Sequence, residues 1–403
     1  MLPHFDQTPI GYLLVKVAAR CNIDCSYCYW FRDKSVYAKP KLMSGTVLAQ
    51  LLKRIEEQIV THSLMEFSIL LHGGEPMLWG IENFCHIANQ CSSISARTGC
   101  TFDLETTTNG ILIDERWVDC FEQNDIHVTL SLDGPAHIHD VHRRTFGGGP
   151  THALVERGIR LLQKRGVPFG VLAVCNPAHQ AVEFVDFFNG IGINDFDIMF
   201  PDATFDDNPL HVAQFYKDLF DLWFKANRDR RSLKIRSVEN MVAGLLGGRS
   251  KSEEIGYAPQ EVCTILTDGS MEPLDVLRIA GDGSTRTSFN IFDNAIEDIK
   301  DEPHWRAARH ASLNLSDKCR KCKYIETCGG GYLPHRFSNQ NGFDNPSVYC
   351  EDLYDTLSYI QAVVEKHIYI AKSSGEKIGI GEAVASVCNS RAPRDSLATN
   401  QRA

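Results

Sequence analysis

Six short apolar segments alternate with amphipathic helical patterns over residues 11–227 of this 403-residue chain. The strand-like segments are 13–17, 67–73, 102–110, 127–134, 169–176 and 196–202. Helical patterns lie between them, such as 45–60, where Ser44 is placed to cap the helix, and 153–166. Because strands that alternate with helices pair in parallel, the sequence predicts an α/β fold. Six units predict a partial (β/α)6 barrel, although the periodicity also fits an open doubly wound sheet.

The same pattern predicts how the chain divides. We expect residues 1–230 to form the barrel, 231–260 a connector, and 261–372 a smaller domain that ends in a helix over 351–371. The last segment, 373–403, is polar and rich in Ser, Ala, Asn and Arg, which predicts a disordered tail.

Composition narrows the environment and the partners. The formal net charge is −10 and no Lys/Arg run occurs, so we expect no nucleic-acid partner. No apolar stretch has the length of a membrane span, and the first residues lack a signal-peptide pattern, so we expect a cytoplasmic protein without membrane contact. In the reducing cytosol, clustered cysteines among the 14 present indicate metal binding or catalysis.

The first cysteine cluster, Cys21, Cys25 and Cys28, follows directly on the first predicted strand as CxxxCxxC. Three thiolates at this spacing can bind three irons of a [4Fe–4S] cluster and leave the fourth iron without a protein ligand. Structural zinc is the alternative, but zinc prefers four protein ligands and no fourth Cys or His lies nearby in the sequence. We interpret as loop and helix-start residues three further candidates for metal binding: His137, His139 and His142.

The cluster resembles the signature of the radical S-adenosylmethionine (SAM) superfamily, because Tyr27 and Tyr29 flank Cys28. The resemblance implies a radical SAM barrel that binds SAM on the free iron, at the carboxyl ends of the strands. The glycines of the HGGEP motif (72–76) permit close backbone approach, and an Arg suits the SAM carboxylate. The SAM contacts that the resemblance implies are Tyr27, Gly73, Gly74, Glu75, Pro76, Thr108, Asn109, Ser131 and Arg143.

The second cysteine cluster comprises Cys319, Cys322, Cys328 and Cys350. By spacing alone, four thiolates fit a closed iron–sulfur cluster and a zinc ribbon equally well. After the upstream motif, this segment resembles the SPASM extension of radical SAM enzymes, which implies an auxiliary [4Fe–4S] cluster on these four residues.

A second auxiliary cluster is usual in the SPASM extension, but this chain departs from its cysteine pattern. Leu274 and Tyr332 stand where two of the cysteine ligands are expected. We therefore predict a single auxiliary cluster, with Cys263 as a structural or leftover thiol. The resemblance also makes Asp275 a candidate catalytic base, although the residue is equally compatible with a turn.

The segments TDGSMEPLDVL and CGGGYLPHRFSNQNGFDNPSVYCEDL resemble peptide maturases that form cyclophanes. The resemblance implies a C–C crosslink between an aromatic side chain and the β-carbon of a nearby residue in a ribosomal precursor peptide. It also implies a reductant such as flavodoxin or ferredoxin. Other SPASM reactions are the alternative: sulfatase formylglycine maturation, thioether formation or epimerisation. A non-catalytic iron–sulfur or zinc protein is a more distant alternative.

Overall fold

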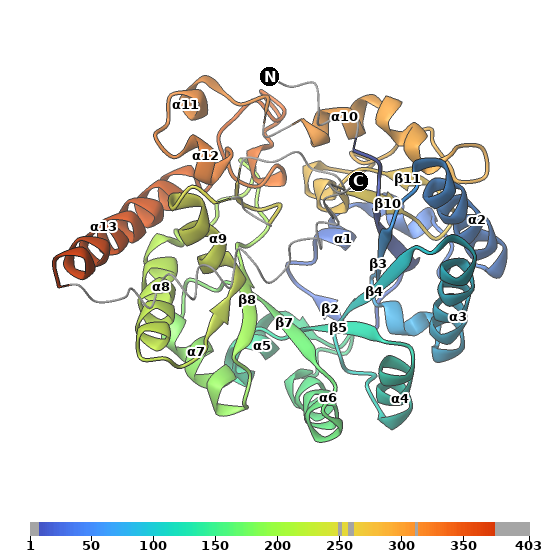
Figure 1. The fold of residues 1–403 in the computed structure, drawn as a ribbon, viewed down its shortest axis with the longest axis horizontal. Helices are drawn as coiled ribbons and strands as arrows, with labels where there is room; N and C mark the ends of the chain where they lie inside the picture. The colour runs from blue at the N-terminus through green and yellow to red at the C-terminus, as the bar shows by residue number, and fades with distance from the viewer. Residues whose placement is uncertain (1–7, 249–251, 257–261, 311–312, 375–403) are drawn as a thin grey trace, which may run out of the picture.

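The computed structural model describes residues 8–248, 252–256, 262–310 and 313–374. Its main sheet has nine strands in the order β11-β10-β1-β3-β4-β5-β7-β8-β9 (Figure 1). All neighbours pair in parallel except β10 and β11. The strands are β1 Tyr12–Ala18, β3 Glu66–Gly73, β4 Thr101–Thr108, β5 Ile126–Ser131, β7 Phe169–Val174, β8 Asp195–Met199, β9 Lys234–Ile235, β10 Cys263–Ile265 and β11 Met271–Glu272. The six predicted strands and the parallel α/β sheet are thereby confirmed.

Long helices cover the outer face of the curved sheet (Figure 1). They are α2 Gly45–His62, α3 Ile81–Thr98, α4 Glu115–Gln123, α6 His152–Arg165, α7 Ala181–Gly190 and α8 Ala213–Arg228. The predicted cap at Ser44 is confirmed, since its hydroxyl accepts a hydrogen bond from the Val47 amide at 3.3 Å. The shorter elements near the site are β2 Asp24–Cys25, α1 Tyr29–Arg32, η3 Pro76–Trp79, α5 Ala136–His142, β6 Arg143–Arg144, η4 Asp275–Ala280, α11 Asp317–Arg320 and α12 Ile325–Cys328.

The strands present different side chains to their two faces. Leu13 and Val15 of β1 are fully buried in the main core, to which α2 contributes. Because side chains alternate along a strand, Lys16 points to the opposite, inner face. Lys16 lies beside His72 in the β1–β3 register, so these two polar residues share the inner face of the sheet.

The chain after the predicted barrel adds strands to both edges of this sheet. Within the predicted connector, β9 pairs with β8 and is followed by helix α9 (Arg236–Leu245). At the other edge, β10 pairs with β1. The predicted C-terminal helix is α13 (Cys350–Ser374), and it packs on α8. The predicted tail therefore begins inside α13, and residues 375–403 lie outside the described part of the chain.

Buried charges fasten the C-terminal part to the loop after β1. Arg278 in η4 forms ion pairs with Asp33 and Glu272, and all three residues are buried. The guanidinium carbon of Arg278 lies 4.5 Å from the centre of the Trp30 ring, and the Lys16 Nζ lies 4.6 Å from it. Two cations therefore contact one buried indole. Among the described residues, no helix is long and apolar enough to cross a membrane.

Candidate active site

The loop after β1 carries Cys21, Cys25 and Cys28, all half-buried. A short antiparallel pair, β2 with β6, places Cys25 opposite Arg143. Next to this pair, the Ser26 amide donates a hydrogen bond to the His142 carbonyl at 3.0 Å. The cysteine loop is thus held on the C-terminal end of α5.

The HGGEP motif packs directly against this loop. A Cβ on Gly73 would lie 2.3 Å from the Ala18 carbonyl oxygen, and a Cβ on Gly74 would lie 2.5 Å from that of Arg20. The same two carbonyls accept hydrogen bonds from the amides of Gly74 and Glu75, at 2.8 and 2.9 Å. The two glycines are therefore required by backbone packing.

The Glu75 carboxylate is fully engaged within the protein. One oxygen accepts from the Met77 amide at 2.9 Å and from the Thr108 hydroxyl at 2.7 Å, and the other accepts from the Asn109 amide at 2.9 Å. Burial raises the pKa of Glu75 to about 7. Of the two ways in which this motif was expected to bind the SAM ammonium, the side chain is already used, and the backbone remains.

Thr108 and Asn109 end β4 next to the cysteine loop. Thr108 is buried against Glu75 and serves to join β4 to the HGGEP turn. The Asn109 amide nitrogen lies 3.7 Å from the Cys21 sulfur and donates to the Asn22 side chain at 2.8 Å. Of these two residues, Asn109 contacts the first cysteine cluster. Pro76 is buried and begins η3.

Arg143 lies in a buried polar group beside Cys25. Its Nε donates to Asp133 at 2.9 Å, and its guanidinium carbon lies 5.4 Å from the centre of the Tyr27 ring. The Tyr27 hydroxyl donates to the same Asp133 carboxylate. Burial opposes ionisation, but Arg143 holds the pKa of Asp133 below its usual range.

The structure therefore brings Tyr27 and Arg143 together through Asp133, which the sequence analysis did not select although it stands in the SLDG segment. The second Asp133 oxygen accepts from the Val174 amide at 3.0 Å, which joins this group to β7. Ser131 is the last residue of β5. In the described part of the chain, Ser131 and Arg143 share no hydrogen bond.

The environment of the first cysteine cluster suits a bound cationic group. Burial raises the pKa of Cys21 to about 12 and that of Cys25 to about 11. Burial also raises the pKa of Cys28. The thiols are therefore protonated until a metal displaces their protons, so metal binding releases protons here.

The second cysteine cluster surrounds a cavity of about 340 Å³. Its thiols come from α11, from the next turn, from the end of α12 and from the first residue of α13. Burial raises the pKa of Cys328 to about 12. The cavity-lining cysteines are the four that the sequence analysis selected: Cys319, Cys322, Cys328 and Cys350.

The spacing of the sulfur atoms separates the two metal alternatives. A single zinc bound at about 2.3 Å holds its sulfur ligands roughly 4 Å apart. Among the described residues, only one group places three potential ligand atoms within 4.8 Å of one another, and it contains no cysteine. The sulfurs of both clusters are thus spaced more widely than one zinc requires, as a multi-iron cluster needs.

The position of the missing auxiliary ligands is apolar. Leu274 and Tyr332 pack with Leu277 and Leu333 in one buried cluster. Cys263 is fully buried in β10. Apolar side chains thus occupy the space where the SPASM pattern places thiols.

Asp275 lies at the start of η4 and is 2% exposed. Its carboxylate forms an ion pair with Lys16 and accepts a hydrogen bond from the Tyr29 hydroxyl. Lys16 Nζ also contacts the Tyr29 hydroxyl at 2.9 Å and His72 Nδ1 at 3.0 Å. Although burial opposes ionisation, Lys16 lowers the pKa of Asp275. Burial, followed by the Lys16 charge, lowers the pKa of His72 to about 3, so His72 is neutral.

The sequence analysis selected Asp275 but missed its partners. Lys16 had a detectable signal, because it is a lysine inside an otherwise apolar strand (LLVKV). Such a residue must find a buried partner or end the strand.

Comparisons with known proteins agree with this geometry. The model of the radical SAM superfamily matches residues 15–189. The cysteine-type anaerobic sulfatase-maturating enzyme of Clostridium perfringens is 26% identical over 87% of this chain and 96% of its own length. The serine-type enzyme of Bacteroides thetaiotaomicron is 26% identical over 87% of this chain and 89% of its own length.

Solved structures have the same fold. The structure of anSMEcpe with bound AdoMet and the Kp18Cys peptide has a TM-score of 0.78 at 25% identity, over 90% of this chain and 99% of that one. Streptococcus suis SuiB bound to precursor peptide SuiA has a TM-score of 0.61 at 16% identity, over 85% of this chain and 76% of that one. The chain therefore has the radical SAM α/β fold, and residues 15–189 form its radical SAM domain.

Proposed function

We propose that this protein is a radical SAM maturase that oxidises the β-carbon of a residue in a peptide or protein substrate. Conversion of Cys or Ser to formylglycine, as in sulfatase maturation, is the first candidate reaction. The observation that carries the proposal is the buried Asp275 carboxylate, which Lys16 keeps ionised on the inner face of the sheet. The sulfatase-maturating relatives support the reaction class, since they align along almost the whole chain.

In this proposal, Cys21, Cys25 and Cys28 hold a [4Fe–4S] cluster with one free iron. When bound, the cluster and SAM supply a carbon radical that removes a hydrogen atom from the substrate. Arg143 offers a buried guanidinium beside Cys25, which suits the SAM carboxylate. The backbone of the HGGEP turn is the candidate partner for the SAM ammonium.

Asp275 has the role of base. After its Cβ hydrogen has left, the substrate must lose one electron and one proton to form the oxidised product. Asp275 accepts that proton on a carboxylate oxygen, and a base must be ionised to do so. Lys16 supplies the opposite charge that favours this ionised form, and neutral His72 fixes the Lys16 ammonium.

The electron requires an acceptor. The four-thiol cavity is the proposed site of an auxiliary [4Fe–4S] cluster, which takes this electron. We propose a single auxiliary cluster, because Leu274 and Tyr332 fill the other position with apolar side chains. Flavodoxin or ferredoxin remains the predicted reductant for the first cluster.

Cyclophane formation is the second candidate. It begins with the same hydrogen removal and loses the same electron and proton, the proton now coming from an aromatic ring. The observation that favours it is the apolar cluster around Leu274 and Tyr332, which departs from the usual SPASM pattern. The relatives named above favour sulfatase maturation over this subtype.

The experiment offers three peptides to the anaerobically reconstituted enzyme with SAM and dithionite. One carries the Cys of a sulfatase maturation site, one carries Ser in its place, and one is rich in aromatic residues. We expect 5′-deoxyadenosine and an aldehyde product that hydroxylamine traps. A crosslinked product loses two hydrogens without trapping and identifies the second candidate. The proposal fails if 5′-deoxyadenosine forms while every peptide, and candidate sulfatase protein, stays unmodified.

A further inference from the structure

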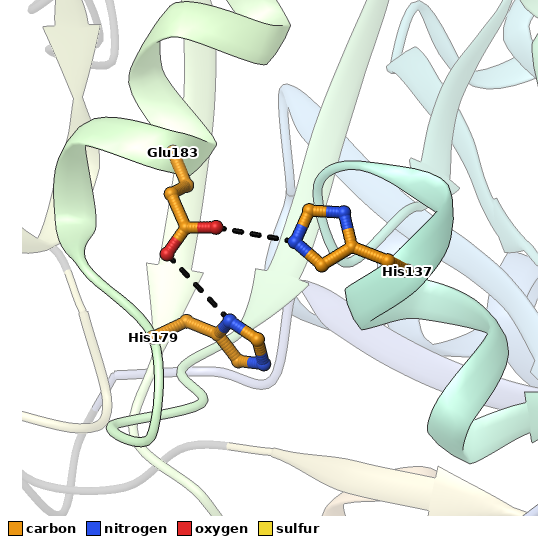
Figure 2. Close-up of side chains that lie close together, drawn as sticks. All are labelled: His137, His179 and Glu183. Carbon is orange, nitrogen blue, oxygen red and sulfur yellow. Dashed lines mark hydrogen bonds and ion pairs between the residues drawn. The ribbon is translucent and has the colours of Figure 1, made fainter.

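Two histidines and a glutamate converge at the edge of the barrel, outside the site described above. His137 lies in the first turns of α5, Glu183 in the first turn of α7, and His179 just before α7. Figure 2 shows the Glu183 carboxylate between the two imidazoles, with one oxygen toward each ring. His137 Nε2 lies 3.1 Å from one oxygen, and His179 Nδ1 lies 3.6 Å from the other.

These side chains are accessible and adaptable. The side chains of His137, His179 and Glu183 are 61%, 28% and 34% exposed. The three ligand atoms lie within 4.8 Å of one another, and this is the single such group among the described residues. The two rings meet edge to face with their centres 5.5 Å apart.

We propose that His137, His179 and Glu183 form a binding site for one divalent transition-metal ion, with zinc as the ion of first choice. Two imidazoles and one carboxylate are a ligand set that zinc uses when it keeps a further position for water. Imidazole also favours the ions near zinc in the first transition row over Mg²⁺ or Ca²⁺.

The distances are compatible with closure around an ion. Ligands at about 2.1 Å from one ion lie no more than roughly 4 Å apart. The widest separation here must therefore shrink by about 1 Å, which exposed side chains achieve by small rotations. One Glu183 oxygen also accepts from the Gln180 amide at 3.0 Å, which fixes the carboxylate at the start of α7. The lowered pKa of Glu183, caused first by that hydrogen bond, keeps it ionised.

The site would connect two segments of the candidate active site. α5 follows the loop that carries Asp133, and the segment before α7 follows β7, whose Val174 amide donates to Asp133. An ion held by His137 and His179 therefore bridges the two chain segments that meet at the Arg143–Asp133 pair. Binding is expected to raise the thermal stability of the protein.

The test measures Zn²⁺ binding to the protein with both cysteine clusters loaded with iron and sulfide, by competition with a coloured chelator. Glu183→Gln retains the carbonyl oxygen that caps α7 but removes the negative ligand, and His137→Ala removes one imidazole. The matched control is His127→Ala, because His127 is an exposed histidine paired with one carboxylate, Asp103, at 3.0 Å.

We expect wild type and His127→Ala to bind one more zinc per chain than His137→Ala or Glu183→Gln. We also expect zinc to raise the melting temperature of the first two proteins only. SAM cleavage without added zinc should be equal in all four, which shows that the variants fold. Equal zinc stoichiometry in wild type and His137→Ala would overturn the proposal and leave a hydrogen-bonded cluster.

Discussion

Lys16 and Asp275 form an ion pair in the centre of the molecule, with side chains that are 0% and 2% exposed. The pair joins β1 to η4, which lie far apart in the sequence but share the inner side of the sheet. Tyr29 and His72 complete the group. A buried carboxylate without a partner would take up a proton, so Lys16 is what keeps Asp275 available as a base at neutral pH.

Asp275→Asn should separate the start of the reaction from its completion. The variant keeps the size of the side chain but cannot accept the proton, so product formation should fall by roughly 10²- to 10⁴-fold. Formation of 5′-deoxyadenosine from SAM should persist, because the first cysteine cluster is untouched. Both products are measured by chromatography in one anaerobic reaction. Undiminished peptide product would remove Asp275 from the mechanism.

Lys16→Met should make stability depend on pH in a new way. In wild type, the lowered pKa of Asp275 contributes stability above its unfolded pKa, and this is lost as pH falls through the folded pKa. In the variant the orphaned carboxylate has a raised folded pKa, so stability instead falls as pH rises toward that value. Breaking a buried pair costs about 3–5 kcal/mol.

The measurement for this pair is denaturant unfolding of wild type, Lys16→Met and the double variant Lys16→Met/Asp275→Asn at pH 6 and pH 8. The double variant removes both charges and should recover much of the lost stability. It should also lose the pH dependence. If the single variant is no less stable at pH 8 than at pH 6, the ion pair does not control the ionisation of Asp275.

Cys350→Ala should remove the auxiliary cluster alone. With one cluster at each cysteine set, the reconstituted wild type should hold about eight irons per chain, and the variant about four. SAM cleavage should continue while multiple turnover stops, because the electron has no acceptor. The control is Cys263→Ala, which changes a buried thiol in β10 and should keep all the iron. About twelve irons in wild type would contradict the single auxiliary cluster.

Gly74→Ala should disrupt the first cluster through the backbone. The added methyl would lie 2.5 Å from the Arg20 carbonyl oxygen, so the cysteine loop must move. We expect a loss of iron from this cluster and about 1–3 kcal/mol of stability. Gly45→Ala is the matched control, since its added methyl meets nothing within 4 Å. Equal iron in the two variants would contradict the tight packing inferred here.

Local patterns predicted the larger part of the fold. Alternating apolar segments located all six parallel strands, and the Ser44 cap marked the start of α2. The pattern could not locate β9, which has only two residues and forms because β8 offers it an edge. Motif spacing located both cysteine sets, since cluster ligands are close in the sequence.

Long-range pairing was beyond the sequence. Nothing near Lys16 indicates that its partner is Asp275, because only the closed sheet brings β1 and η4 together. The same holds for Glu183, which lies far along the chain from His137. The hydrogen bonds that engage Glu75 also depend on the end of β4.

The most direct test of the central claim follows the hydrogen atom itself. A sulfatase-site peptide whose Cys carries deuterium at the β-carbon is incubated anaerobically with the reconstituted enzyme, SAM and dithionite. Our account predicts deuterium in 5′-deoxyadenosine together with an aldehyde in the peptide. It is contradicted if 5′-deoxyadenosine forms without deuterium and neither this peptide nor an aromatic-rich peptide labelled at its β-carbons is changed.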